Sequence, residues 1–316
     1  MKIKNSKIIV AALSLSMILS ACGNKDNSND GSNGSNPTEN ASTASEKKEG
    51  ENTKANEEDF DISVVSREDG SGTRGAFIEL VGLEEEKDGE KKDLTTDEAV
   101  VQNSTNGVMQ TVSQDPSAIG YVSLGSVNDN VKKVKVDGAE ATEENIESGA
   151  YTLQRPFNLA FKEDKLDDLA KDFLAFVLSK DAQDIVEKEG YIKVEAKDYK
   201  GKKIKGDLTI AGSTSVTPLM EKLVEAYKAK NPNVVIDIQS NGSSAGMTAA
   251  MEGTAQIGMA SRELKDEEKN ALDFTVIARD GIAVIVNKEN ACEDVTMDDL
   301  QKIFTGELTE WSGLAK

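Results

Sequence analysis

Short apolar runs alternate with longer amphipathic runs along most of the chain. The short runs are rich in β-branched residues and predict strands at 62–66, 208–211, 234–240 and 282–286. The longer runs repeat apolar residues at helical spacing, and the last of them has Pro218 in its first turn. They predict helices at 166–177, 182–189 and 219–230. Strands and helices in alternation predict an α/β fold with largely parallel sheets.

Residues 1–21 have the pattern of a lipoprotein signal peptide. Three lysines precede an apolar run at 8–19, which is shorter than a membrane-spanning helix needs. Small residues then stand before Cys22, as in a bacterial lipobox. Either Cys22 is acylated and becomes the mature N-terminus, or an ordinary secretory signal contains an incidental cysteine. We favour acylation because a polar tail begins immediately after Cys22.

The polar tail contains almost no apolar residue and is built from Asn, Ser, Gly, Thr, Lys and Glu. Such a composition cannot bury enough surface to offset the entropy lost on ordering. Residues 22–58 are therefore predicted to be a disordered tether between the membrane and a folded domain.

Composition excludes several classes of function. The 316 residues include no histidine, which removes Ser-His-Asp triads and nearly all zinc sites. The formal net charge of −20 opposes binding to nucleic acid, and loss of the three signal lysines lowers it to −23. An anion site in this chain must therefore act through short-range hydrogen bonds and local dipoles. We expect no metal and no cofactor.

Three predicted strands run into Gly/Ser/Thr loops that precede helices, at 64–74, 210–218 and 238–246. Loops of this kind present unpaired N–H groups at helix N-termini, which favour anions. A single such loop is better explained by helix capping, but three of them favour a shared anion site. The Gly-x-Gly-x-x-Gly match at 70–75 lacks the second strand of a dinucleotide fold, since a charged run occupies 83–92.

These loops carry the resemblance to a known family. The sequences Ala211-Gly212-Ser213-Thr214-Ser215-Val216, Gly242-Ser243-Ser244-Ala245-Gly246 and Ser66-Arg67-Glu68-Asp69-Gly70-Ser71-Gly72-Thr73 resemble the periplasmic-type phosphate-binding proteins of phosphate ABC transporters. Ile257-Gly258-Met259-Ala260-Ser261-Arg262 and Ile303-Phe304-Thr305-Gly306-Glu307 are similar too. The likeness covers nearly everything from residue 60 onward.

The order of the two halves differs from that family. Residues 60–195 resemble the family's C-terminal half, whereas residues 206–316 resemble its N-terminal half. We interpret this order as a circular permutation joined through 197–206; the alternative is a truncated tandem protein. The resemblance implies a two-lobe clamshell, with one lobe at 59–155 plus 287–316 and the other at 156–286, closing by a hinge motion.

The resemblance also implies the ligand contacts. It places phosphate at Thr214, Ser215, Ser243, Arg67, Asp69, Ser71, Gly72 and Thr73. Arg67 would pair with the anion, and Asp69 would accept a hydrogen bond from a protonated phosphate oxygen, which sulfate lacks near neutral pH. Some members have an aspartate where Ser261 stands, although Ser261 can still donate a hydrogen bond.

The predicted function is extracytoplasmic, lipid-anchored binding of inorganic phosphate for delivery to an ABC importer. Its expected partners are the permease subunits and the membrane that holds the anchor, and we expect a monomer. A phosphate sensor or surface protein without transport is the alternative. A phosphohydrolase with Ser71 or Thr73 as nucleophile is disfavoured, because neither a histidine nor an obvious metal cluster could activate the hydroxyl.

Overall fold

The computed structural model describes residues 61–87 and 90–314 of the chain. From residue 61 onward the described residues belong to one compact unit. The predicted signal peptide, Cys22 and the predicted tether lie outside the described residues. Within the described ranges, no helix is both long and apolar enough to cross a membrane.

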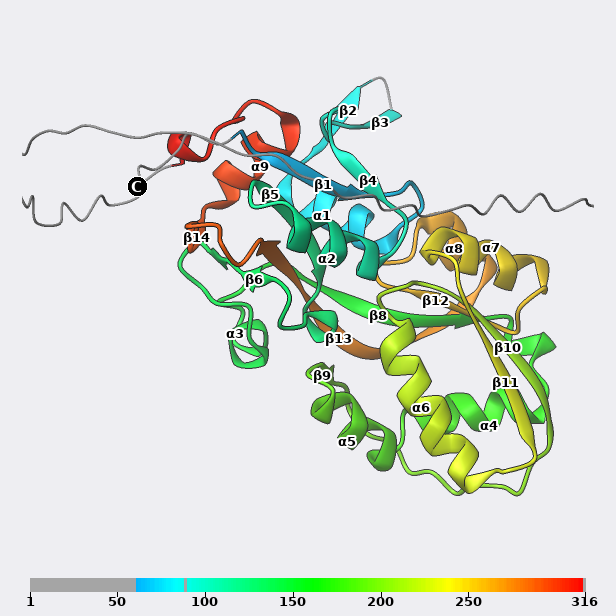
Figure 1. Cartoon of the computed structure of the whole chain (residues 1–316). Coiled ribbons are helices and arrows are strands. Elements are labelled where there is room, and N and C mark those ends of the chain that lie inside the picture. The colour runs from blue at the N-terminus through cyan, green and yellow to red at the C-terminus, as the bar shows by residue number, and fades with distance from the viewer. Residues whose placement is uncertain (1–60, 88–89, 315–316) are drawn as a thin grey trace, which may run out of the picture. The chain divides into compact units, whose positions relative to one another are not determined.

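A mixed sheet of ten strands forms the centre of the described part (Figure 1). Eight strands follow one another in the order β11 (Val234–Ser240), β10 (Gly206–Gly212), β12 (Ile257–Ala260), β8 (Gln154–Phe161), β13 (Asp273–Val286), β5 (Ala118–Ser123), β1 (Ser63–Arg67) and β4 (Val100–Gln102). Two short strands, β6 (Lys132–Lys133) and β9 (Ile192–Lys193), also pair with β13. Two-stranded sheets are formed by β2 (Glu84–Lys87) with β3 (Glu90–Asp93), and by β7 (Lys135–Val136) with β14 (Asp294–Val295).

The prediction of largely parallel sheets is correct at both ends of the main sheet and wrong in its middle. β10 pairs in parallel with β11 and β12, and β1 pairs in parallel with β4 and β5. In between, β8 and β13 run antiparallel to each other and to their outer neighbours β12 and β5. The three strand pairs in the middle of the sheet are thus antiparallel, so the strands of one parallel part run opposite to those of the other.

Helices connect most of these strands. They are α1 (Gly72–Val81), α2 (Thr105–Gln114), α3 (Glu143–Glu147), α4 (Asp168–Val177), α5 (Lys180–Lys188), α6 (Thr217–Lys230), α7 (Ser243–Glu252), α8 (Asp266–Ala271) and α9 (Met297–Thr305). The three helices predicted from apolar spacing are α4, α5 and α6, and Pro218 does lie in the first turn of α6.

The apolar side chains form two main cores. One contains Phe77 stacked on Tyr121, with ring centroids 4.0 Å apart. The other contains Phe173 against Tyr227, with centroids 5.2 Å apart. β13 contributes to both, because Ile277 belongs to the second core and the segment 282–286 to the first. The long strand thus passes from one core to the other. The assignment of lobe boundaries to 155 and 286 stays a prediction.

The first and last described segments of the chain lie side by side. Asp61 forms an antiparallel bridge with Glu310. The amide of Ile62 donates to the carbonyl of Thr309 at 2.6 Å. The start of β1 is therefore a direct neighbour of the segment that follows α9.

Candidate functional site

Three strands are each followed by a loop and the N-terminus of a helix, and the three loops lie close together. β1 leads into α1, β10 leads into α6, and β11 leads into α7. Gly72 and Ser243 are the first residues of α1 and α7, so their amides are among those left without a partner inside the helix. The turn before α1 needs Gly70, whose φ of +82° is a conformation that other residues rarely adopt.

The loops predicted to share an anion do meet. Thr73 Oγ1 and Ser215 Oγ share a buried hydrogen bond of 2.8 Å. The Ser261 amide donates to Ser243 Oγ at 3.2 Å. Gly72 comes so close to these serines that a Cβ on it would lie 2.2 Å from Ser243 Oγ and 2.7 Å from Ser261 Oγ. A side chain at position 72 would therefore collide with the adjoining loops.

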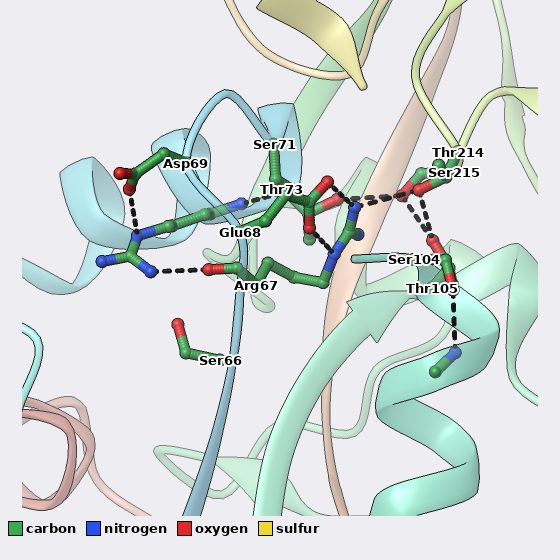
Figure 2. A network of polar contacts seen from close by, with 12 residues as sticks. Ser66, Arg67, Glu68, Asp69, Ser71, Thr73, Ser104, Thr105, Thr214 and Ser215 are labelled. Atoms are coloured by element: carbon green, nitrogen blue, oxygen red, sulfur yellow. Dashed lines mark hydrogen bonds and ion pairs between the residues drawn. The ribbon is translucent and has the colours of Figure 1, made fainter. Parts of the chain in front are cut away.

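Arg67 places a guanidinium group next to these hydroxyls, although the side chain is only 2% exposed. It donates through Nη2 to Thr214 Oγ1 at 3.0 Å (Figure 2). It also donates through Nε and Nη2 to the two carboxylate oxygens of Glu68, at 2.7 and 2.8 Å. The forked guanidinium thus joins β1 to the loop after β10.

A fourth loop contributes a residue that the sequence analysis missed. Thr105 is 3% exposed, and its hydroxyl lies 3.1 Å from Ser215 Oγ and 3.3 Å from Thr214 Oγ1. It begins α2 directly after the short strand β4 and the turn at Ser104, whose hydroxyl caps the helix by accepting from the Gly107 amide. A short strand followed by Ser-Thr and a helix repeats the pattern of the other three loops. The same sequence pattern could therefore have predicted Thr105 as a site residue.

Comparison with known proteins identifies the family of this chain. A PBP superfamily domain matches residues 41–181 and 198–315. The phosphate-binding protein PstS 2 of Streptococcus agalactiae serotype V is 54% identical over 258 residues, which cover 81% of this chain and 88% of that protein. The chain belongs to the PstS family of the PBP superfamily.

Two further relatives differ in how much of the chain they match. The crystal structure of a phosphate ABC transporter, phosphate-binding protein from Streptococcus pneumoniae TIGR4 shares 47% identity and a TM-score of 0.66, covering 81% of this chain and all of that one. The phosphate-binding protein PstS of Bacillus subtilis is 34% identical over 117 residues, which cover 35% of this chain and 38% of that protein.

Among the predicted site residues of this PstS-family chain, Asp69 lies apart. Its side chain is fully exposed, and its contact with a cation is to Arg74 Nε at 3.9 Å. Figure 2 shows Asp69 on the side of Arg67 away from Thr214 and Ser215. Glu68, one position earlier in the loop, is the carboxylate that lies against Arg67. Ser71 caps α1 by accepting from the Arg74 amide at 3.3 Å.

Arg74 holds the backbone of Arg67 in place through a hydrogen bond. Its Nη1 donates to the Arg67 carbonyl at 2.5 Å, and its Nε and Nη2 donate to Asp93 Oδ2 at 2.9 and 2.7 Å. Burial alone would lower the pKa of Arg74, but the hydrogen bonds and charge of Asp93 outweigh it, so the pKa rises. The pKa of Asp93 is lowered in turn: burial opposes ionisation, but bonds from Thr95 and Arg74 overcome that cost. Both groups therefore stay charged at neutral pH.

Proposed function

We propose that this protein binds one inorganic phosphate ion and delivers it to the permease subunits of an ABC importer at the outer face of the membrane. The observation that carries the proposal is the convergence of Arg67 with the hydroxyl of Thr214 and the buried hydroxyls of Thr73, Thr105 and Ser215. A ring of neutral donors around one guanidinium suits a tetrahedral oxyanion. Membership of the PstS family supports a binding protein rather than an enzyme.

The proposed contacts follow from this geometry. Arg67 would neutralise the anion's charge. Neutral donors would come from Ser71, Gly72, Thr73, Thr105, Thr214, Ser215, Ser243 and Ser261. The family resemblance also implied Asp69 as acceptor of a hydrogen bond from the ligand, but Glu68 lies against Arg67 and is better placed for that role. A carboxylate beside the anion would accept a hydrogen bond from the O–H of hydrogen phosphate and repel sulfate, which has no such proton near neutral pH.

Two observations support the proposed circular permutation. The contact between Ile62 and Thr309 means that residues after α9 could continue into β1 without rearrangement. The Bacillus subtilis match stops after about a third of each chain, as a collinear alignment must when the halves are exchanged. A reordered gene encoding 206–316 followed by 61–199 should fold and bind phosphate. A reordered chain that does not fold would count against permutation.

Uptake measurements test the transport part of the proposal. Deleting the gene should reduce uptake of radiolabelled phosphate at low external concentration, and restoring it should recover the uptake. A deletion strain with normal uptake, whose purified protein still binds phosphate, would favour the sensor or surface-protein alternative. Release of phosphate from a phosphomonoester by the purified protein would favour the phosphohydrolase.

A further inference from the structure

A buried ion pair lies next to the site at the point where β13 passes between the two cores. Arg155 on β8 and Asp280 on β13 are direct cross-strand partners. Arg155 donates to Asp280 Oδ2 through Nη2 at 3.0 Å and through Nε at 3.3 Å. The two side chains are 1% and 0% exposed. This pairing fixes the plane of the Arg155 guanidinium. Its third nitrogen, Nη1, is not used in the pairing with Asp280.

That remaining nitrogen reaches a proposed phosphate contact. Nη1 of Arg155 donates to Ser261 Oγ at 3.4 Å. Ser261 follows β12, which pairs with β8, and its side chain is completely buried. The strand pair that carries Arg155 therefore also sets the distance between Arg155 and Ser261.

The neighbours of Ser261 determine the direction of its hydroxyl. Ser213 Oγ accepts from the amides of Ser215 and Val216, so its own hydrogen goes to Ser261 Oγ at 2.8 Å. Ser261 Oγ thus accepts from both Ser213 and Arg155, which occupies its two lone pairs. Its single hydrogen must then be given to some other acceptor. The backbone of Gly72 approaches this oxygen closely, which places the hydroxyl at the proposed site.

We infer that Arg155, held by Asp280, is a positioning residue that commits the Ser261 hydroxyl to donate a hydrogen bond to the bound phosphate. The inference rests on the proposed function. It assigns Arg155 no contact with the ligand: the residue acts through Ser261. Without Arg155, the Ser261 hydroxyl can rotate and accept instead of donating, and the ligand loses one oriented donor.

Arg155→Lys is the first test variant. A lysine can still pair with Asp280 across the strands, but one ammonium group cannot also hold the fixed fork that reaches Ser261. We expect the phosphate dissociation constant, measured by calorimetry, to rise about ten- to a hundredfold, as loss of one hydrogen bond to a charged ligand does. Ser261→Ala should raise it by a similar factor. Arg279→Lys is the control, because Arg279 is exposed and lies next to Asp280 on β13. This variant should bind phosphate as the unsubstituted protein does.

The double variant Arg155→Lys/Ser261→Ala decides between positioning and general support of the fold. If Arg155 acts through Ser261, the double variant binds phosphate no more weakly than Ser261→Ala alone. The inference is overturned if the increase in dissociation constant of the double variant is the product of the increases of the two single variants. It is also overturned if Arg155→Lys binds phosphate normally. Should Arg155→Lys fold poorly in urea titrations, Asp280→Asn is tested in the same cycle, with the same two outcomes. Failure of the unsubstituted protein to bind phosphate would instead overturn the proposed function.

Discussion

Thr73 Oγ1 and Ser215 Oγ lie 2.8 Å apart, although the two residues are separated by 142 positions in the chain. One stands at the start of α1 after β1, and the other stands in the loop after β10. Each half of the sequence therefore supplies only part of the donor set. The proposed donor set is complete only where the loop after β1 meets the loop after β10.

Replacing Arg67 with alanine tests the charge partner of the anion. The variant should weaken phosphate binding by about 2–5 kcal/mol, as removal of one partner of a desolvated charge pair does. Titration calorimetry measures the loss, and far-ultraviolet circular dichroism checks that the variant folds. Unchanged affinity would mean that Arg67 serves only to hold Glu68 and Thr214.

The neighbours Ser104 and Thr105 form a matched pair for separating binding from folding. Thr105→Val removes the hydroxyl next to Ser215 but keeps the shape, and it should cost about 1 kcal/mol of phosphate binding. Ser104→Ala removes the cap of α2, and it should lower the free energy of unfolding by about 1 kcal/mol while leaving binding unchanged. Equal effects of both variants on binding would exclude a ligand contact at Thr105.

Acid should destabilise the protein in part through Glu268. Burial opposes ionisation of this carboxylate, but hydrogen bonds from Arg262 at 2.7 and 2.8 Å outweigh it and lower its pKa. A lowered pKa stabilises the fold above the ordinary glutamate pKa of about 4.3, and the contribution is lost as the pH falls through that value toward the lowered one.

Glu268→Gln should therefore reduce the free energy of unfolding by about 3 kcal/mol at pH 7, because it leaves Arg262 buried without its charge partner. The difference between variant and unsubstituted protein should shrink as urea titrations are taken below about pH 4. A difference that is the same at pH 7 and pH 3.5 would show that the ionised carboxylate is not what stabilises this position.

The lipid anchor is tested at Cys22, outside the described residues. Cys22→Ser should release the protein from the membrane fraction or block its processing, because serine offers no thiol for acylation. Fractionation and metabolic labelling with palmitate measure both effects. A variant that stays membrane-bound and correctly processed would rule out the lipobox interpretation.

Local patterns in the sequence were sufficient to predict α4, α5, α6 and the loops of the site, because apolar spacing and Gly/Ser/Thr runs are local signals. The antiparallel centre of the sheet could not be predicted this way, since the pairing of β8 with β13 joins segments far apart in the chain. Thr105 was missed because β4 is short and partly exposed, so that its strand signal is weak. The placement of Glu68, rather than Asp69, against Arg67 depends on which way each side chain points from the loop, which residue types alone do not specify.

Calorimetric titration of the purified protein with phosphate, arsenate and sulfate decides whether this protein binds phosphate selectively. We predict one phosphate per chain and measurable binding of arsenate, which resembles phosphate in shape and protonation. Sulfate should bind much more weakly, because it has no proton with which to donate a hydrogen bond to the carboxylate beside Arg67. Absence of phosphate binding, or sulfate binding as tight as that of phosphate, would contradict the proposed function.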